Sequence, residues 1–260
     1  MVEHDEVKRR ISTRFGAAAG NYVSSAVHAK GDDLPRLVEL ARLRGDERVL
    51  DVATGGGHTA LAFAPHVREV VASDLTPDML AAAEEFIRGR GIENASFELA
   101  DAEELPFADG GFDVVVCRIA AHHFPEPERF VREAARVLAP GGRFLLDDNV
   151  APEDPEMDEF MNRFEKWRDP GHVRAHRVSE WQAFMEDAGL HVEHVEPPGR
   201  KPYPFEEWTS RIGMPESERD ALEAWLLAAS QKFKNFFEIV VENGRVVSLT
   251  GVYTILVALR

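Results

Sequence analysis

Short apolar runs alternate with longer amphipathic segments along the first 150 residues. Apolar residues dominate at 49–52, 70–74, 97–99, 113–117 and 143–147, and these five segments are predicted to be strands. The spacing of apolar residues between them predicts helices at 33–44, 76–88 and 126–138, the last ended by Pro140-Gly141-Gly142. Strands that alternate with helices are typical of βαβ units, so we expect a largely parallel sheet.

The pattern changes after residue 150. Apolar residues at helical spacing run from Met157 to Trp167 and from Leu222 to Phe233, which predicts two further helices. Ser179 with Gln182 has the form of a capping box, and the helix that it opens would end at Gly189.

The C-terminal third carries strand and turn signals. Leu190 to Val195 is predicted as a strand, and the proline-rich stretch 197–204 as an irregular segment. Asn243-Gly244 is a hairpin signal between apolar segments at 237–241 and 245–249. The last predicted strand covers 252–259.

A glycine loop and two acids carry the strongest chemical signal. The first strand contains Asp51 and runs into the loop Ala53-Thr54-Gly55-Gly56-Gly57, and the second strand ends at Asp74. Glycines let the backbone approach a ligand closely because they have no Cβ atom. An acid at the end of the next strand suits the two hydroxyl groups of a ribose. The sequence therefore predicts a site for an adenosine-type cofactor.

The same loop leaves more than one cofactor open. The spacing Gly55-x-Gly57-x-x-Ala60 fits the dinucleotide fingerprint, so an NAD-dependent oxidoreductase is one alternative. However, the carboxylate of Asp51 at the mouth of the loop would repel a diphosphate, and no Lys or Arg lies between Arg48 and Arg68 to offset it. An acid there suits an ammonium group instead. S-adenosyl-L-methionine (SAM) carries an ammonium group and a sulfonium and has no phosphate.

Five ordered blocks of sequence resemble the class I SAM-dependent methyltransferases, specifically the branch with the ubiquinone/menaquinone and biotin-pathway enzymes. The blocks are Val49–Gly57, Val70–Asp74, Asp101-Ala102 with Leu105-Pro106-Phe107, Phe112–Cys117, and Arg136–Gly142. One departure is that Ala53 stands where the family has its first loop glycine.

The resemblance implies a fold and a reaction. The fold would be a single doubly wound α/β domain with a Rossmann-like, mostly parallel sheet of seven strands whose last strand is antiparallel. Residues 1–31 would form an N-terminal lid, 32–148 the cofactor-binding core, and 150–180 with 197–235 a helical cap. The reaction would be in-line SN2 transfer of the SAM methyl group to a carbon, oxygen or nitrogen of a small-molecule acceptor, with S-adenosyl-L-homocysteine (SAH) as product. A non-catalytic SAM-binding protein is a second alternative.

The resemblance also assigns residues to the nucleoside. Asp74 would accept hydrogen bonds from both ribose hydroxyls, and Leu75 and Met79 would flank the adenine. Asp101 and Ala102, after the third strand, would bind the exocyclic amine and ring nitrogen of the base.

The methionine part of SAM would lie against the loop. Gly55 and Gly57 would let the backbone touch it, and Asp51 would face its ammonium group. Arg118 would either bind its carboxylate or form a structural ion pair. Tyr22 and Phe15 would lie over the cofactor as part of the lid, or pack against the sheet.

Two adjacent histidines, His122 and His123, follow the fourth strand on the rim where substrates of the family bind. A histidine there could act as a general base, because its unperturbed pKa is about 6.5. Adjacent residues on a helix face different directions, so we expect one of the two to face the substrate. The alternative is a packing or helix-start role, since methyl transfer from a sulfonium depends chiefly on alignment.

The cap carries basic and aromatic candidates. An anion pocket for the acceptor is one interpretation of the basic segment from 163 to 177, and ion pairs with the many acids are the other; the segment holds Arg163, Lys166, Arg168, His172, Arg174, His176 and Arg177. The spacing of His172 and His176 does not complete a metalloprotease motif, so no metal site is predicted. An acceptor pocket lined by aromatic side chains is a hypothesis that rests on Trp167, Trp181, Trp208 and Phe205.

The composition and charge of the chain narrow the range of possible binding partners. A formal charge of −16 over 260 residues disfavours nucleic acid and anionic membranes. The lone Cys117, the polar start Met1–Glu6 and the lack of a membrane-spanning apolar run favour a cytoplasmic protein without membrane insertion. We expect a small molecule as partner, and the sequence leaves a homodimer open.

Overall fold

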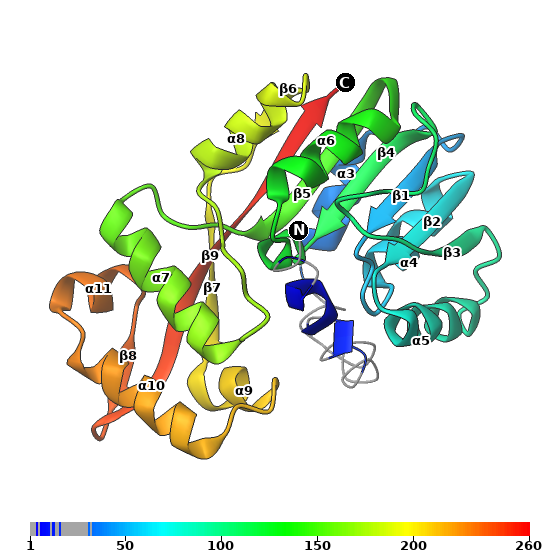
Figure 1. Cartoon of the computed structure of the whole chain (residues 1–260). Coiled ribbons are helices and arrows are strands. Elements are labelled where there is room, and N and C mark those ends of the chain that lie inside the picture. Colours follow the sequence, from blue (N-terminus) through cyan, green and yellow to red (C-terminus); the bar gives the residue numbers. More distant parts are fainter. Residues whose placement is uncertain (1–3, 5, 11, 14–15, 17–30, 32) are drawn as a thin grey trace.

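One twisted sheet organises the molecule. The computed structural model describes residues 4, 6–10, 12–13, 16, 31 and 33–260. Seven strands follow one another in the order β3-β2-β1-β4-β5-β9-β6 (Figure 1), and β9 is antiparallel to both of its neighbours. The strands of this path are β1 (Arg48–Val52), β2 (Glu69–Asp74), β3 (Ala95–Leu99), β4 (Phe112–Arg118), β5 (Leu138–Asn149), β6 (His191–Val195) and β9 (Arg245–Leu259). The predicted α/β fold with an antiparallel last strand is confirmed.

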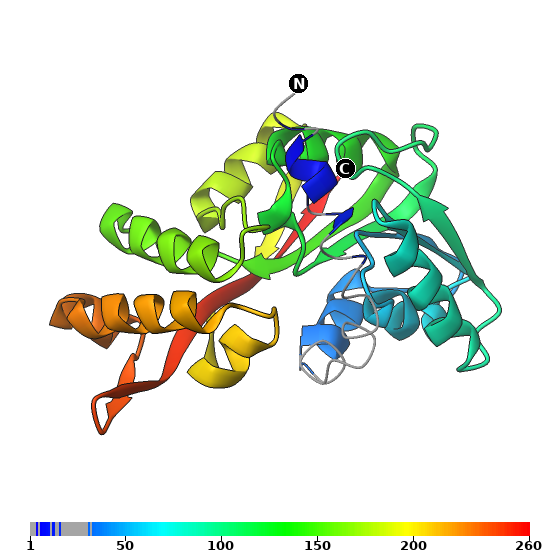
Figure 2. The same cartoon turned by 60° about the horizontal axis from the view of Figure 1, so that its bottom comes forward.

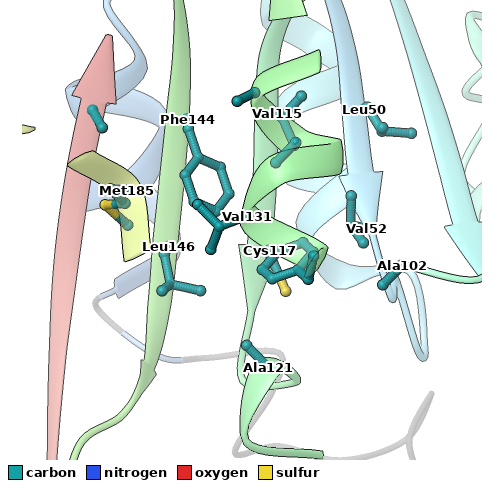
Figure 3. Packing of buried hydrophobic residues seen from close by; sticks show 14 of the residues in the cluster. Leu50, Val52, Ala102, Val115, Cys117, Ala121, Val131, Phe144, Leu146 and Met185 are labelled. Carbon is teal, nitrogen blue, oxygen red and sulfur yellow. The ribbon is translucent and has the colours of Figure 1, made fainter. Parts of the chain in front are cut away.

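Helices cover both faces of the sheet. One face packs against α3 (Asp33–Ala41), α4 (His58–Phe63) and α5 (Pro77–Arg88). The other packs against α6 (Pro127–Val137) and α8 (Val178–Asp187). In Figure 3, Phe144 of β5 lies beside Val131 of α6, within the same buried cluster as Met185 of α8. Two hydrophobic cores therefore hold the sheet rigid and fix the positions at which its strands end.

A cap with its own hydrophobic core packs around the N-terminal half of β9. Its helices are α7 (Pro155–Arg168), α9 (Phe205–Ser210), α10 (Glu216–Ala228) and α11 (Gln231–Phe236). They gather around the lower half of β9 in Figure 1 and stand apart from the parallel strands in Figure 2. Their buried side chains form a third cluster that includes Met161, Phe164, Trp208 and Leu226.

Two further strands pair with β9 outside the seven-strand path. The proline-rich stretch predicted to be irregular is an antiparallel strand, β7 (Gly199–Pro204). Proline lacks a backbone N–H and cannot donate a hydrogen bond to a neighbouring strand. β7 is an edge strand paired with β9, and among the strands that the structure describes none lies along its other edge and requires a backbone donor. The hairpin at Asn243-Gly244 is present, because both residues have positive φ and join β8 (Val240–Glu242) to β9.

Several predicted boundaries were wrong. The predicted helix from Leu222 to Phe233 is divided in two, because α10 ends at Ala228 and α11 begins at Gln231. β5 begins at Leu138, so Pro140-Gly141-Gly142 lies within the strand. The segments at 245–249 and 252–259 form a single strand, β9. Helix α8 begins at Val178: Glu180 Oε2 accepts a hydrogen bond from the backbone N–H of Arg177 at 2.8 Å, and the Ser179 hydroxyl instead donates to Glu153.

Candidate active site

A cavity joins the carboxyl ends of the parallel strands to the cap. We call its two parts the sheet half and the cap half. The sheet half is lined by Gly55, Asp74, Leu75, Met79, Asp101, Ala102 and Arg118. The cap half is lined by His122, His123, His172, Lys201, Tyr203 and Trp208. Ligands of open α/β sheets bind at the carboxyl ends of the strands, and this cavity lies there.

Asp74 is held rigidly in the sheet half. Its Oδ2 accepts a hydrogen bond from the backbone N–H of Gly55 at 3.0 Å, and its Oδ1 accepts one from Thr76 at 2.8 Å. Burial raises the pKa of Asp74, and these backbone donors oppose the shift. The Thr76 hydroxyl and the Leu75 backbone N–H also favour the charged form, so this carboxylate is fixed in place where it lines the cavity.

Asp51 and Gly57 stabilise the conformation and packing of the glycine loop. Asp51 Oδ2 accepts hydrogen bonds from Thr54 Oγ1 at 2.6 Å and from the Ala60 backbone N–H at 3.0 Å. Burial raises the pKa of Asp51 to about 7, so the group is partly protonated at neutral pH. A Cβ on Gly57 would lie 3.0 Å from Ile87 Cδ1 of α5. Neither residue lines the cavity, so its geometry gives their predicted ligand contacts no support.

Asp101 faces the cavity together with a lysine that the sequence did not single out. Lys8 Nζ lies 2.7 Å from Asp101 Oδ2 and 2.5 Å from Glu103 Oε2. The Glu103 backbone N–H donates to Asp101 Oδ1 at 2.9 Å. Residues 6–10 are helical, so this lysine links the N-terminal helix to the strand end predicted to bind adenine.

Arg118 leaves β4 within a buried cluster of charges. Its guanidinium pairs with Asp33 of α3, and its Nε lies 3.6 Å from Asp147 Oδ2 of β5. Burial, and then the neighbouring charge of Asp33, raise the pKa of Asp147 well above its usual range. The structural ion pair that the sequence left open is therefore present, while Arg118 also lines the cavity.

His122 is anchored by a buried acid. The turn η2 (Ala121–His123) follows β4, and Asp148 at the end of β5 bonds His122 twice. Its Oδ1 lies 2.6 Å from the ring Nδ1, and its Oδ2 accepts the backbone N–H at 2.8 Å. Burial lowers the pKa of His122, but the acids around it, Asp148 first and then Glu165 and Asp169, together outweigh burial, so the net shift is upward.

The pKa values of the two neighbouring histidines, His123 and His172, are shifted downward instead. Burial, and then the charge of His122, lower the pKa of His123 to about 4, and its Nδ1 bonds the carbonyl of Gly171 at 2.8 Å. The pKa of His172 is lowered for the same reasons, and its Nε2 bonds Asn162 Oδ1 at 2.9 Å. Within the described part of the chain, no cluster of three or more ligating side chains is placed to hold a metal ion. Of the three rings, His122 is the one whose pKa is raised rather than lowered.

The basic segment divides between ion pairs and the cavity. Arg174 and Arg177 both pair with Asp158, at 2.8 and 2.7 Å. Of the seven basic and histidine side chains in the segment, Arg168 and His172 line the cavity.

Of the four aromatic candidates, only Trp208 lines the cavity, stacked with Tyr203 at 5.9 Å between ring centroids. Trp181 and Phe205 lie in hydrophobic cores, and Trp167 Nε1 donates to Glu218 at 2.8 Å. Tyr22 and Phe15 lie outside the described residues.

Sequence reasoning missed several lining or supporting residues, chiefly Lys8, Asp148, Lys201 and Tyr203. Asp148 could have been found, because Asp147-Asp148 is a pair of acids at a strand end. Lys201 and Tyr203 gave no signal, since a proline-rich segment was not expected to be a strand.

Comparison with known proteins fits this geometry. Residues 50–146 match the methyltransferase domain family. The uncharacterized methyltransferase YcgJ of Bacillus subtilis is 41% identical over 237 residues, which cover 91% of this chain and 93% of its own. The crystal structure of a protein of Bacillus halodurans assigned as a methyltransferase has a TM-score of 0.86 and 45% identity, and covers 88% of this chain and 99% of that one. Demethylmenaquinone methyltransferase of Thermus thermophilus is 42% identical over 113 residues, 43% of this chain and 51% of its own.

The chain therefore belongs to the SAM-dependent methyltransferases and has their class I fold. The resemblance drawn from the five sequence blocks is confirmed, and an NAD-dependent oxidoreductase is no longer a competing class. No helix among residues 33–260 or the shorter described pieces is long and apolar enough to span a membrane.

Proposed function

We propose that this protein binds SAM in the sheet half of the cavity and methylates a small molecule bound in the cap half. The observation that carries the proposal is the single cavity that joins Gly55, Asp74 and Asp101 to His122 and the aromatic pair Tyr203 and Trp208. Bound SAM supplies an electrophilic methyl group on a positively charged sulfur. The acids of the sheet half suit that charge.

The residues of the sheet half fit the nucleoside. Asp74, fixed by two backbone N–H groups where it lines the cavity, offers carboxylate oxygens to the ribose hydroxyls. Leu75 and Met79 offer apolar contacts to the adenine, and Asp101 with Ala102 offers an acceptor for its amine. Gly55 presents backbone to open space, since no atom lies within 4 Å of where its Cβ would be.

The cap half supplies a proton acceptor. With Nδ1 of His122 bonded to Asp148, a neutral ring carries its hydrogen on that nitrogen and keeps the lone pair of Nε2. An acceptor that becomes more acidic as its oxygen or nitrogen bonds the methyl group can pass its proton to Nε2. His123, with its pKa lowered to about 4, is the poorer base. Of the two predicted catalytic histidines we therefore propose His122.

Asp74→Ala tests the cofactor site. We expect SAM binding to weaken at least about tenfold, roughly 1.4 kcal/mol, because charge-assisted bonds to the ribose are lost. Titration calorimetry measures the affinity, and thermal melting verifies that the variant is folded. Asp78→Ala, an exposed acid in the first turn of α5, is the matched control and should bind SAM normally. An unchanged affinity in Asp74→Ala would remove the ribose role.

A further inference from the structure

Lys201 reaches the cavity from the cap. It lies on β7 opposite Gly251 of β9, and its side chain is half-buried. It lines the same cavity as Gly55 and Arg118, with Tyr203 two residues further along the strand. Lys201 is therefore a positively charged side chain of the cap half that lies near Arg118. The methionine part of SAM is expected beside Arg118.

The neighbouring charges already balance one another without Lys201. Burial, and then the charge of Asp33, raise the pKa of the neighbouring Asp147, and two carboxyl groups this close share one proton and one negative charge. Arg118 pairs with both and matches that charge. In the part of the chain that the structure describes, no carboxylate oxygen lies within 4 Å of Lys201 Nζ, so its charge has no close counter-ion.

A charged ammonium group in this position destabilises the protein when no ligand is bound. Burial lowers the pKa of Lys201, the acids Asp33 and Asp147 oppose that shift, and Arg118 adds to it. A partly buried charge without a partner is unfavourable, and such groups concentrate at functional sites. An anion that entered the cavity would remove the cost.

We propose that Lys201 binds a carboxylate group of a ligand in this cavity. This inference rests on the proposed function. SAM carries one such group on its methionine part, and a carboxylate on the methyl acceptor would offer the same chemistry. Lys201 lines the same cavity as Arg118 and the aromatic pair of the cap half, so it is in reach of either source.

Two ligands that differ by the amino-acid group test the first source. SAH keeps the carboxylate, whereas 5′-methylthioadenosine has the same nucleoside without it. If the cofactor supplies the carboxylate, Lys201→Met weakens SAH binding about tenfold in calorimetry and leaves 5′-methylthioadenosine within about twofold. Lys201→Arg, which keeps the charge, retains SAH affinity. Lys232→Met, an exposed lysine of α11 paired with Glu156, is the control and changes neither.

The second source is tested with SAH already bound. Benzoate, a small aromatic carboxylate, is then titrated into the saturated protein. If the acceptor supplies the carboxylate, the parent protein binds benzoate, Lys201→Met loses it at least tenfold, and SAH affinity is unchanged. A folded Lys201→Met with both affinities unaltered would overturn the inference. A parent protein that binds neither SAH nor 5′-methylthioadenosine would instead overturn the proposed function.

Discussion

Ala53 has a backbone conformation that favours glycine. Its φ is +55°, and it follows β1 at the start of the loop that lines the cavity. Ile119, just after β4, has φ +52° and lines the same cavity. Left-handed conformations cost residues with a Cβ about 1–2 kcal/mol and often mark functional sites. The strain at these two strand ends therefore lies where the ligand is expected.

Ala53→Gly is predicted to be tolerated or stabilising. Relief of the left-handed strain, about 1–2 kcal/mol, outweighs or matches the added freedom of the unfolded chain, roughly 0.4–1 kcal/mol. Ala81→Gly, at an exposed position in α5, should lose about 1 kcal/mol because glycine is a poor helix former. Urea unfolding of both variants checks this. Equal destabilisation would show that Ala53 is not strained.

The pair of His122 and Asp148 should make stability depend on pH. The pKa of His122 is raised in the folded protein above its unfolded value of about 6.5. The stabilisation from the charged pair is therefore complete below about pH 6.5 and is lost as the pH rises through the folded value. His122→Asn should cost more unfolding free energy at about pH 6 than at about pH 9.

Urea unfolding at the two pH values measures this difference. Asp148→Asn removes the same charged pair from the other side and should give the same pH trend. A cost that is independent of pH in both variants would contradict the pairing.

Packing against helix α5 explains one of the two loop glycines that have positive φ. Gly57 has φ +82°, and a Cβ there would lie 3.0 Å from Ile87 and 3.2 Å from Ala83 of α5. Gly55 has φ +53° and open space where its Cβ would be. The loop thus uses Gly57 to pack against α5 and Gly55 to leave room for a ligand.

Gly57→Ala is predicted to be the more destabilising change, by roughly 1–3 kcal/mol, because it adds overpacking to the strain. Gly55→Ala should carry the strain alone, about 1 kcal/mol, and should lower SAM affinity by filling the cavity. Chemical unfolding and calorimetry on both variants separate the two roles. The opposite order of stabilities would contradict the assignment.

The sequence predicts elements well where one local rule dominates. The predicted and observed ends of α5 agree closely, because Pro77 suits a first turn and Gly89 follows the last residue. Local rules failed where a long-range partner decided the outcome. Pairing with β9 makes a strand of the proline-rich stretch. β5 pairs with β4 at Leu138 and again from Arg143, where its pairing with β9 also begins, so the strand runs through the predicted Pro-Gly-Gly break.

At the scale of the molecule, the sequence predicted the sheet half of the site more completely than the cap half. Asp74, Leu75, Met79, Asp101 and Ala102 line the cavity because parallel strands end at a common edge. The cap half is assembled from η2, α7, β7 and α9, whose arrangement no periodicity encodes. This division explains why the family and its cofactor are predictable, while Lys201 and Tyr203 emerged only from the fold.

Calorimetry with SAM and NAD⁺ side by side tests whether the sheet half of the cavity binds SAM. We expect saturable binding of SAM with one molecule per chain, and no heat of binding for NAD⁺, because acids line the sheet half and no Lys or Arg that could bind a phosphate lies in residues 49–67. Tight binding of NAD⁺ to a folded protein that gives no response to SAM would contradict it.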